Sequence, residues 1–121
     1  MTDQERVFNL RERYLRDPIP TRLGNLASSL ARLASSAALP ARRATATYLL
    51  LETESFIEWT GPMVAPAIQP ELADMQVELA RWRLRYESLP AQQIDCAAVA
   101  ELARHSSQRV LQWSGLLEQE P

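Results

Sequence analysis

The side chains of this sequence that could bind a metal ion or exchange a proton fall in two stretches of predicted helix. Glu52, Glu54 and Glu58 lie in one stretch, and His105, the single histidine, lies in the other. Carboxylate-bridged metal sites of helical bundles place a glutamate three residues before a histidine on each of two helices. Here the histidine follows Glu101 by four residues and has no counterpart. We therefore expect no metal ion, no other cofactor and no catalytic residue.

The spacing around His105 favours a structural role. Glu101, His105 and Arg109 recur every four residues, which predicts a row of ion pairs on one helix surface. Cys96 lies about two and a half helical turns before His105, so their side chains point to opposite faces about 13 Å apart along the axis. They therefore do not form a nucleophile and base pair. As the single cysteine, Cys96 also cannot form an internal disulfide.

One basic and aromatic segment, Arg81-Trp82-Arg83-Leu84-Arg85-Tyr86, has the composition of a nucleic-acid contact. Guanidinium groups beside aromatic rings can bind phosphates and stack on bases. On a helix, however, neighbouring residues point about 100° apart. This spacing predicts Trp82 and Tyr86 in the core and Arg81 and Arg85 on an outer face. Arg83 is also predicted to be solvated. An anion site, a nucleic-acid site and a partner interface remain as alternatives.

Residues 61–70 form a connection that is unusually long and apolar for a bundle. Such connections typically have about 2 to 8 residues, whereas this one contains three prolines as well as Met63, Val64 and Ile68. These apolar side chains either cover the bundle end as a lid on Trp59 and Trp113 or form an exposed docking loop. We keep both interpretations.

The candidate side chains must be positioned by helices that the prolines separate. A capping box at Thr2 and Glu5 predicts a helix over about residues 3–16. Further helices are predicted after Pro18 and Pro20 to residue 37, from about Pro40 to residue 59, and from Pro70 to about residue 89. The last begins between residues 90 and 95 and ends at residue 115. We predict an all-α fold, an antiparallel up-and-down helical bundle of four long helices plus a shorter N-terminal helix, forming a single domain of residues 1–121.

Apolar rows show which faces of these helices are buried. In the second helix the row is Leu23, Leu26, Leu30, Leu33 and Ala37, and the small residues between them allow a neighbour to approach closely. The third helix is apolar on several sides, so we place it centrally. The fourth carries a main row, Leu72, Met75, Leu79, Trp82, Tyr86 and Leu89. Its second row, Ala73, Val77, Ala80 and Leu84, is predicted to widen the buried face.

The up-and-down order also predicts where the aromatic anchors lie. The third and fifth helices run in the same direction, so Trp59 and Trp113 should lie at one end of the bundle. Trp82 should lie toward the other end, near Tyr48. Gly115 is predicted to end the last helix in a left-handed conformation, with residue 116 packing back on residue 111.

Composition excludes several broad classes of protein. Hydrophobic residues make up 46% of the chain, as in ordinary globular proteins, and the net charge is −2. Residues 1–43 hold eight arginines and four acids, whereas residues 44–121 hold five arginines and eleven acids. The acidic pI argues against bulk nucleic-acid binding. No apolar run is long enough for a membrane span or a secretory signal, so we expect no membrane partner and a cytoplasmic location.

Four segments resemble known sequences along nearly the whole chain. They are residues 17–24 (DPIPTRLG), 56–60 (FIEWT), 79–82 (LARW) and 113–117 (WSGLL). On these segments the chain resembles a group of small uncharacterised all-helical proteins of cyanobacteria. The resemblance implies a small helical protein and carries no activity and no site residues.

These observations support three hypotheses of function. The first is a non-enzymatic interaction module that forms a homodimer or other homo-oligomer, or binds a protein partner, through Met63, Val64, Ile68, Trp59, Trp113, Arg81 and Arg85. The second is a small-molecule-binding or enzymatic bundle with a pocket near a tryptophan pair. The third is weak nucleic-acid or anion binding through arginines, decided by whether the basic surface of residues 1–43 continues to Arg81 and Arg85.

Overall fold

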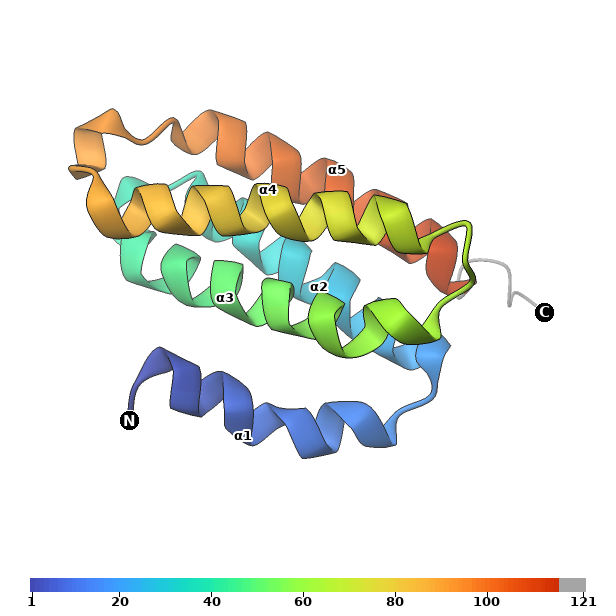
Figure 1. Ribbon diagram of the computed structural model, residues 1–121. Coiled ribbons are helices and arrows are strands. Elements are labelled where there is room, and N and C mark those ends of the chain that lie inside the picture. The colour runs from blue at the N-terminus through green and yellow to red at the C-terminus, as the bar shows by residue number, and fades with distance from the viewer. Residues whose placement is uncertain (116–121) are drawn as a thin grey trace.

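The structure, a computed structural model, describes residues 1–115 and is all-α within them (Figure 1). Its helices are α1 (Asp3–Arg16), α2 (Ile19–Ala37), α3 (Arg43–Thr60), α4 (Gln69–Ser88) and α5 (Cys96–Ser114). Short 3-10 turns at Pro40–Arg42, Gly61–Met63 and Ala91–Gln93 lie within the connections that follow α2, α3 and α4. The predicted all-α class is confirmed, and successive helices run back and forth as predicted.

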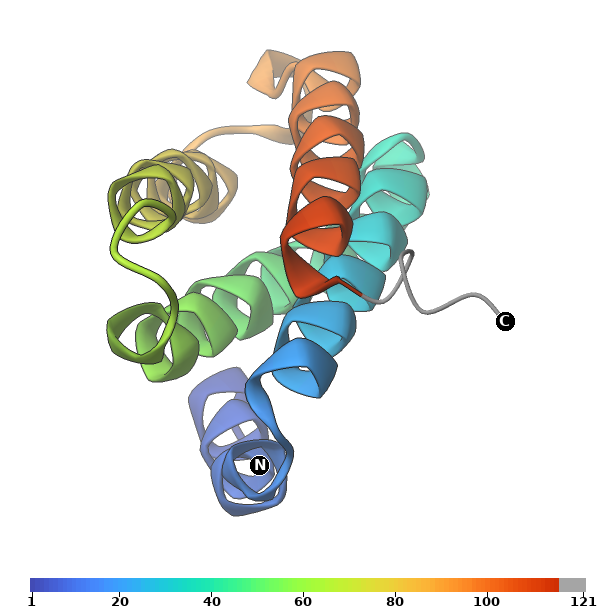
Figure 2. The same cartoon turned by 90° about the vertical axis from the view of Figure 1, so that its right-hand side faces the viewer.

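Helix α3 lies at the centre of the arrangement. It packs against α2 on one side and α4 on another, and α1 contacts it from a third; α2 in turn packs along α5. Figure 2 shows this order from the bundle end, with α1 and α4 on different sides of α3. The apolar middle of the third helix predicted this central position, because a helix that is hydrophobic all round must be surrounded.

The helix ends follow the capping chemistry of their residues. The Thr2 hydroxyl oxygen accepts a hydrogen bond from the Glu5 amide at 3.1 Å and lies 3.1 Å from the Glu5 carboxylate. The Asp95 carboxylate accepts from the Ala98 amide at 3.0 Å and caps α5. Gly115 has φ 74°, the left-handed conformation that the sequence predicts. The predicted contact of residue 116 lies outside the described residues.

The predicted row of α2 and the apolar side chains of α3 contribute much of the core. All five residues of the α2 row are buried. Small residues bring α2 and α5 together, since the Ser107 hydroxyl donates to the Ala27 carbonyl at 2.7 Å. At the other end of the core, the Arg43 guanidinium donates to the carbonyls of Tyr86 and Leu89 and satisfies the last turn of α4.

One prediction about α4 is wrong. Its second row is not buried: Val77 is 49% exposed and Leu84 57% exposed, while Ala73 is exposed and Ala80 half-buried. The reason is that α4 is an outer helix, whose main row already faces α3 and the core. The second row lies on a different part of the helix circumference, and within residues 1–115 no other helix covers it.

The ends of α3 and α5 lie at the same end of the bundle, as predicted (Figure 1). The Trp59 ring packs 5.7 Å from Tyr14 and 5.9 Å from Phe56, whereas the Trp113 ring lies 5.4 Å from the Arg109 guanidinium. Each tryptophan therefore has its own neighbours.

The connection between α3 and α4 has both buried and exposed apolar side chains. Val64 is buried and Ile68 packs partly against the core, but Met63 is 63% exposed. The Gln69 side chain donates to the Val64 carbonyl at 3.0 Å and holds the segment against the start of α4. None of the helices within residues 1–115 has the length and apolar character needed to cross a bilayer.

Candidate functional site

The three glutamates of α3 do not form one site. Glu52 and Glu54 are both buried but point to different neighbours, because residues two apart on a helix point about 200° apart. Glu58 is exposed. Within residues 1–115 no group of three or more metal-ligating side chains lies close enough to hold a metal ion.

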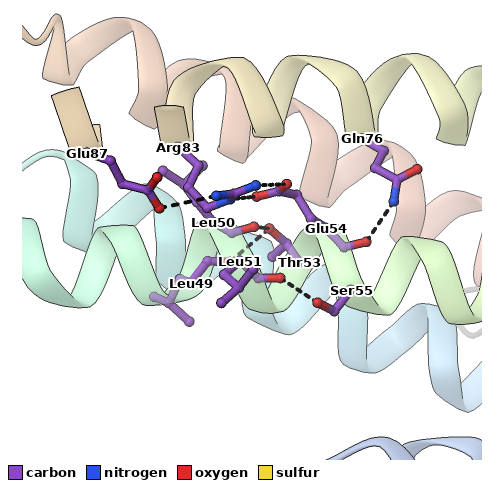
Figure 3. A network of polar contacts seen from close by, with 9 residues as sticks. All are labelled: Leu49, Leu50, Leu51, Thr53, Glu54, Ser55, Gln76, Arg83 and Glu87. Atoms are coloured by element: carbon purple, nitrogen blue, oxygen red, sulfur yellow. Dashed lines mark hydrogen bonds and ion pairs between the residues drawn. The ribbon is translucent and has the colours of Figure 1, made fainter. Parts of the chain in front are cut away.

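Glu54 ties α3 to α4 (Figure 3). The Arg83 guanidinium binds both carboxylate oxygens, with Nε 2.7 Å from Oε2 and Nη2 3.2 Å from Oε1. Arg83 also pairs with Glu87 at 3.2 Å, and the Gln76 amide donates to the Glu54 carbonyl at 3.1 Å. Burial raises the pKa of Glu54, and the hydrogen bonds and charge of Arg83 oppose that rise without cancelling it.

This ion pair corrects the interpretation of the basic and aromatic segment. Arg81 and Arg85 are exposed, as predicted, and the Arg85 guanidinium lies 4.6 Å from the Trp82 ring centre. Arg83, however, is largely buried and structural rather than solvated. In the sequence, the signal for such a partner is a glutamate in a helix that is apolar on several sides, because a buried carboxylate needs a cation opposite it.

The predicted row of ion pairs on the last helix is also wrong. Glu101 pairs with Arg104 rather than with His105, because an arginine three residues away is within reach on the same surface. Arg109 instead pairs with Glu71 at the start of α4. His105 is exposed and makes neither contact.

Cys96 lies beside a cavity of about 10 Å³, room for one water molecule at most. Burial raises the pKa of the neighbouring Tyr86 to about 12, and the Cys96 thiol adds to that rise. The Tyr86 hydroxyl is buried and has no hydrogen-bond partner within residues 1–115. The cavity is too small for a ligand, so we assign this pair no functional role.

Polar and charged groups line an open cleft between α1 and α2. Its volume is about 640 Å³, which lies in the range of small-molecule sites. Arg6 and Arg13 line it from α1, and Arg32 lines it from α2. Its floor is formed by α3 through Tyr48, Glu52 and Phe56.

The sequence explains why this cleft stays open. The chain turns tightly between α1 and α2, which makes the helices neighbours. Apart from Leu10 and Tyr14, however, their facing sides carry polar and charged residues. Hydrogen bonds hold the end of α1 that lies at the turn. The Tyr14 hydroxyl lies 2.7 Å from the Thr60 hydroxyl. The Arg22 side chain donates to the carbonyls of Leu15 and Asp17 at 2.6 and 2.7 Å. Helix α1 is therefore anchored at one end of an unpacked polar cleft.

Glu52 forms the charged centre of the cleft floor. Its carboxylate accepts from the Ser29 hydroxyl at 2.7 Å, from Arg32 at 3.2 Å and from the Tyr48 hydroxyl at 3.3 Å. Burial and the charge of Glu52 raise the pKa of Tyr48. The Arg6 guanidinium covers the Tyr48 ring at 4.0 Å from its centre. The composition of residues 1–43 indicated a basic surface, but the cleft itself could not be found from the sequence.

Comparison with known protein families, with curated proteins and with solved structures finds no match for this chain. The resemblance to small helical proteins of cyanobacteria therefore stays a prediction. Two features of the structure bear on function: the arginine-lined cleft between α1 and α2, and the exposed apolar row on α4.

Proposed function

We propose that this protein is a helical interaction module that associates with itself through the outer face of α4. The observation that carries the proposal is the exposed apolar row of Ala73, Val77, Ala80 and Leu84. These residues follow the spacing of four, three and four that places side chains in a seam between two helices. The row extends about 17 Å along the helix at about 1.5 Å per residue.

The row is complementary to a second copy of itself in antiparallel orientation. When two such helices run past each other in opposite directions, Val77 of one copy faces Ala80 of the other. Leu84 likewise faces Ala73, so each large side chain meets a small one. A parallel pairing would instead place each alanine opposite itself and leave space unfilled, which costs packing energy.

The charges beside the row favour the same arrangement. Asp74 and Arg81 each follow an alanine of the seam, and both are exposed. Within residues 1–115 neither side chain has an ion-pair partner. In the antiparallel pairing Asp74 of one copy faces Arg81 of the other, and the two-fold axis repeats this contact. Charged residues that flank a seam set partner choice and orientation.

The other predicted contact residues support a smaller role. Met63 is exposed at the bundle end, whereas Val64 is buried and Trp59, Trp113 and Ile68 are half-buried. Among the predicted contact residues, only Met63, Arg81 and Arg85 are therefore exposed enough to contact a different protein. A cytoplasmic location belongs to the same proposal, supported by the single cysteine.

The experiment measures dimerisation of charge-reversal variants by sedimentation equilibrium, from about 10 µM to about 1 mM because one helix seam gives a weak dimer. We expect D74R and R81D each to dissociate the homodimer, since like charges then face each other. Mixing D74R with R81D should restore a heterodimer, because every flanking pair is again of opposite charge.

Two further variants decide the position of the interface. L84E should give a monomer, while F8E serves as the matched control, because Phe8 is an equally apolar and 67% exposed residue on α1. A wild-type chain that stays monomeric throughout this range would overturn the proposal. So would a dimer that F8E breaks and L84E leaves intact.

A further inference from the structure

We propose that the cleft between α1 and α2 binds a small molecule through a chain of phosphate groups. This proposal does not rest on self-association, since the cleft and the apolar row of α4 lie on different helices. It rests on the arginines that line the cleft, on the hydrogen bonds that its two acids already accept, and on its size.

The side chains of two arginines in and beside the cleft, Arg13 and Arg42, have no partner within residues 1–115, and that of a third, Arg6, is weakly paired. Within residues 1–115 the Arg13 side chain has no hydrogen bond and no ion-pair partner. Arg6 approaches Asp3 only at 3.7 Å, and the side chain is 52% exposed. An adjoining hollow of about 470 Å³ shares Arg6 and Arg32 with the cleft and adds Arg42. The Arg42 side chain likewise has no partner in the described part of the chain.

The two acids of the cleft already accept hydrogen bonds from other groups, and Glu52 is also ion-paired. Glu52 is 4% exposed and accepts hydrogen bonds from Ser29, Arg32 and Tyr48. Asp17 lies at the end of the cleft beside the turn and accepts from the Asn25 side chain at 3.3 Å. The charges of Arg13 and Arg42 therefore remain available to an anion, with Arg6 only weakly paired, and an excess of one sign of charge in a cleft concentrates the field.

Only one of the ion pairs joins the basic first part of the chain to the acidic remainder. That pair is Arg32 with Glu52; the others lie within residues 1–43 or within residues 44–115. Within the part that the structure describes, the excess positive charge of residues 1–43 is thus left largely uncompensated. This disfavours the view that the two parts of the chain simply neutralise each other.

The residue types select phosphate chains among possible anions. A guanidinium group donates two parallel hydrogen bonds that match phosphate oxygens. Arg6 and Arg13 are about 10 Å apart along α1 at about 1.5 Å per residue, and Arg32 lines the opposite wall. One phosphate group cannot reach all of them, whereas a di- or triphosphate extends along the cleft. Ser28 on the α2 wall leaves room beside them and supplies a hydroxyl donor.

The test is isothermal titration calorimetry with inorganic tripolyphosphate at low salt concentration. Replacement R13Q removes one cleft charge from a side chain with no partner, so the fold should be unaffected. The matched control is R11Q, because Arg11 is exposed on the same helix but lines a different surface. We expect R13Q to weaken binding about tenfold and R11Q less than about twofold. The R42Q variant should also weaken binding, by a smaller factor.

Two comparisons identify the source of the phosphates. A nucleoside triphosphate that binds more tightly than tripolyphosphate indicates a nucleotide, whose base would lie against the apolar lining residues Leu10 of α1 and Phe56 of α3. Equal affinities indicate the phosphate chain alone. Absence of binding at low salt would overturn the proposal, as would equal losses of affinity in R13Q and R11Q.

A single-stranded oligonucleotide that binds more tightly than tripolyphosphate, and that R13Q and R11Q weaken equally, would point to nucleic acid instead. Repeating the titration on L84E distinguishes failure of this site from failure of the proposed dimer.

Discussion

Glu54 is a buried carboxylate whose charge depends on one arginine. Replacing Arg83 with methionine should destabilise the protein by about 3 kcal/mol, because an unpaired charge would stay buried. E54M should cost less, about 1 kcal/mol, since the Arg83 side chain is 23% exposed and keeps its contact with Glu87. Urea denaturation at pH 7 measures both values. A larger loss in E54M than in R83M would contradict this account.

The pH dependence of the same variants tests the cause of the loss. Because burial raises the pKa of Glu54 above its ordinary 4.5, its neutral form is favoured in the folded state. Its stabilising contribution is therefore present below pH 4.5 and is lost as the pH rises through the higher pKa of the folded state. Without Arg83 that pKa rises further. The destabilisation by R83M should thus be smaller near pH 4 than at pH 7, and equal losses would mean that charge is not its cause.

These side chains also show how far the sequence can be interpreted. Two glutamates in a helix that is apolar on several sides indicate buried partners, and a spacing of two residues already separates their directions. The identity of the partners, Arg32 for Glu52 and Arg83 for Glu54, depends on how α2 and α4 are placed around α3. That placement is a tertiary property, which helical periodicity does not determine.

Helix α1 is held mainly by Tyr14, whose ring stacks on Phe56 at 4.2 Å and whose hydroxyl contacts Thr60. We expect Y14F to cost about 1 to 2 kcal/mol, because the buried Thr60 hydroxyl loses a partner. Y14A should cost about 3 to 5 kcal/mol, because it also leaves a cavity. Hydrogen exchange should quicken in residues 3–16 before α2–α5 respond. Uniform acceleration over all helices would show that α1 is not a separate unit.

The elements divide into those that local chemistry determines and those that it does not. Prolines and caps predicted α1 over residues 3–16 and the end of α5 at Gly115, because these signals act within one turn. The sequence predicts the outer row of α4 in the core, because apolar periodicity shows which face of a helix is apolar but not what covers it. The sequence does not predict the open cleft beside α1. Helices that follow each other closely are expected to pack, but here their polar facing sides keep them apart.

At the scale of the whole molecule, the two proposed surfaces should act independently. Helices α1 and α4 contact different sides of α3 (Figure 2), which carries Glu52 toward the cleft and Glu54 toward α4. Coupling between two sites requires an element with two arrangements that both ligands bias. Residues 43–60 instead form one continuous helix, whose buried side chains are packed on three sides.

We therefore expect saturating tripolyphosphate to change the dimer dissociation constant by less than about twofold. By reciprocity, monomeric L84E should bind tripolyphosphate with the wild-type affinity. Sedimentation equilibrium with and without the anion measures the first quantity, and calorimetry on L84E measures the second. A coupling of about tenfold or more in both experiments would show that α3 shifts between two positions, and E54M should then reduce it, because Glu54 and Arg83 link α3 to the dimer helix.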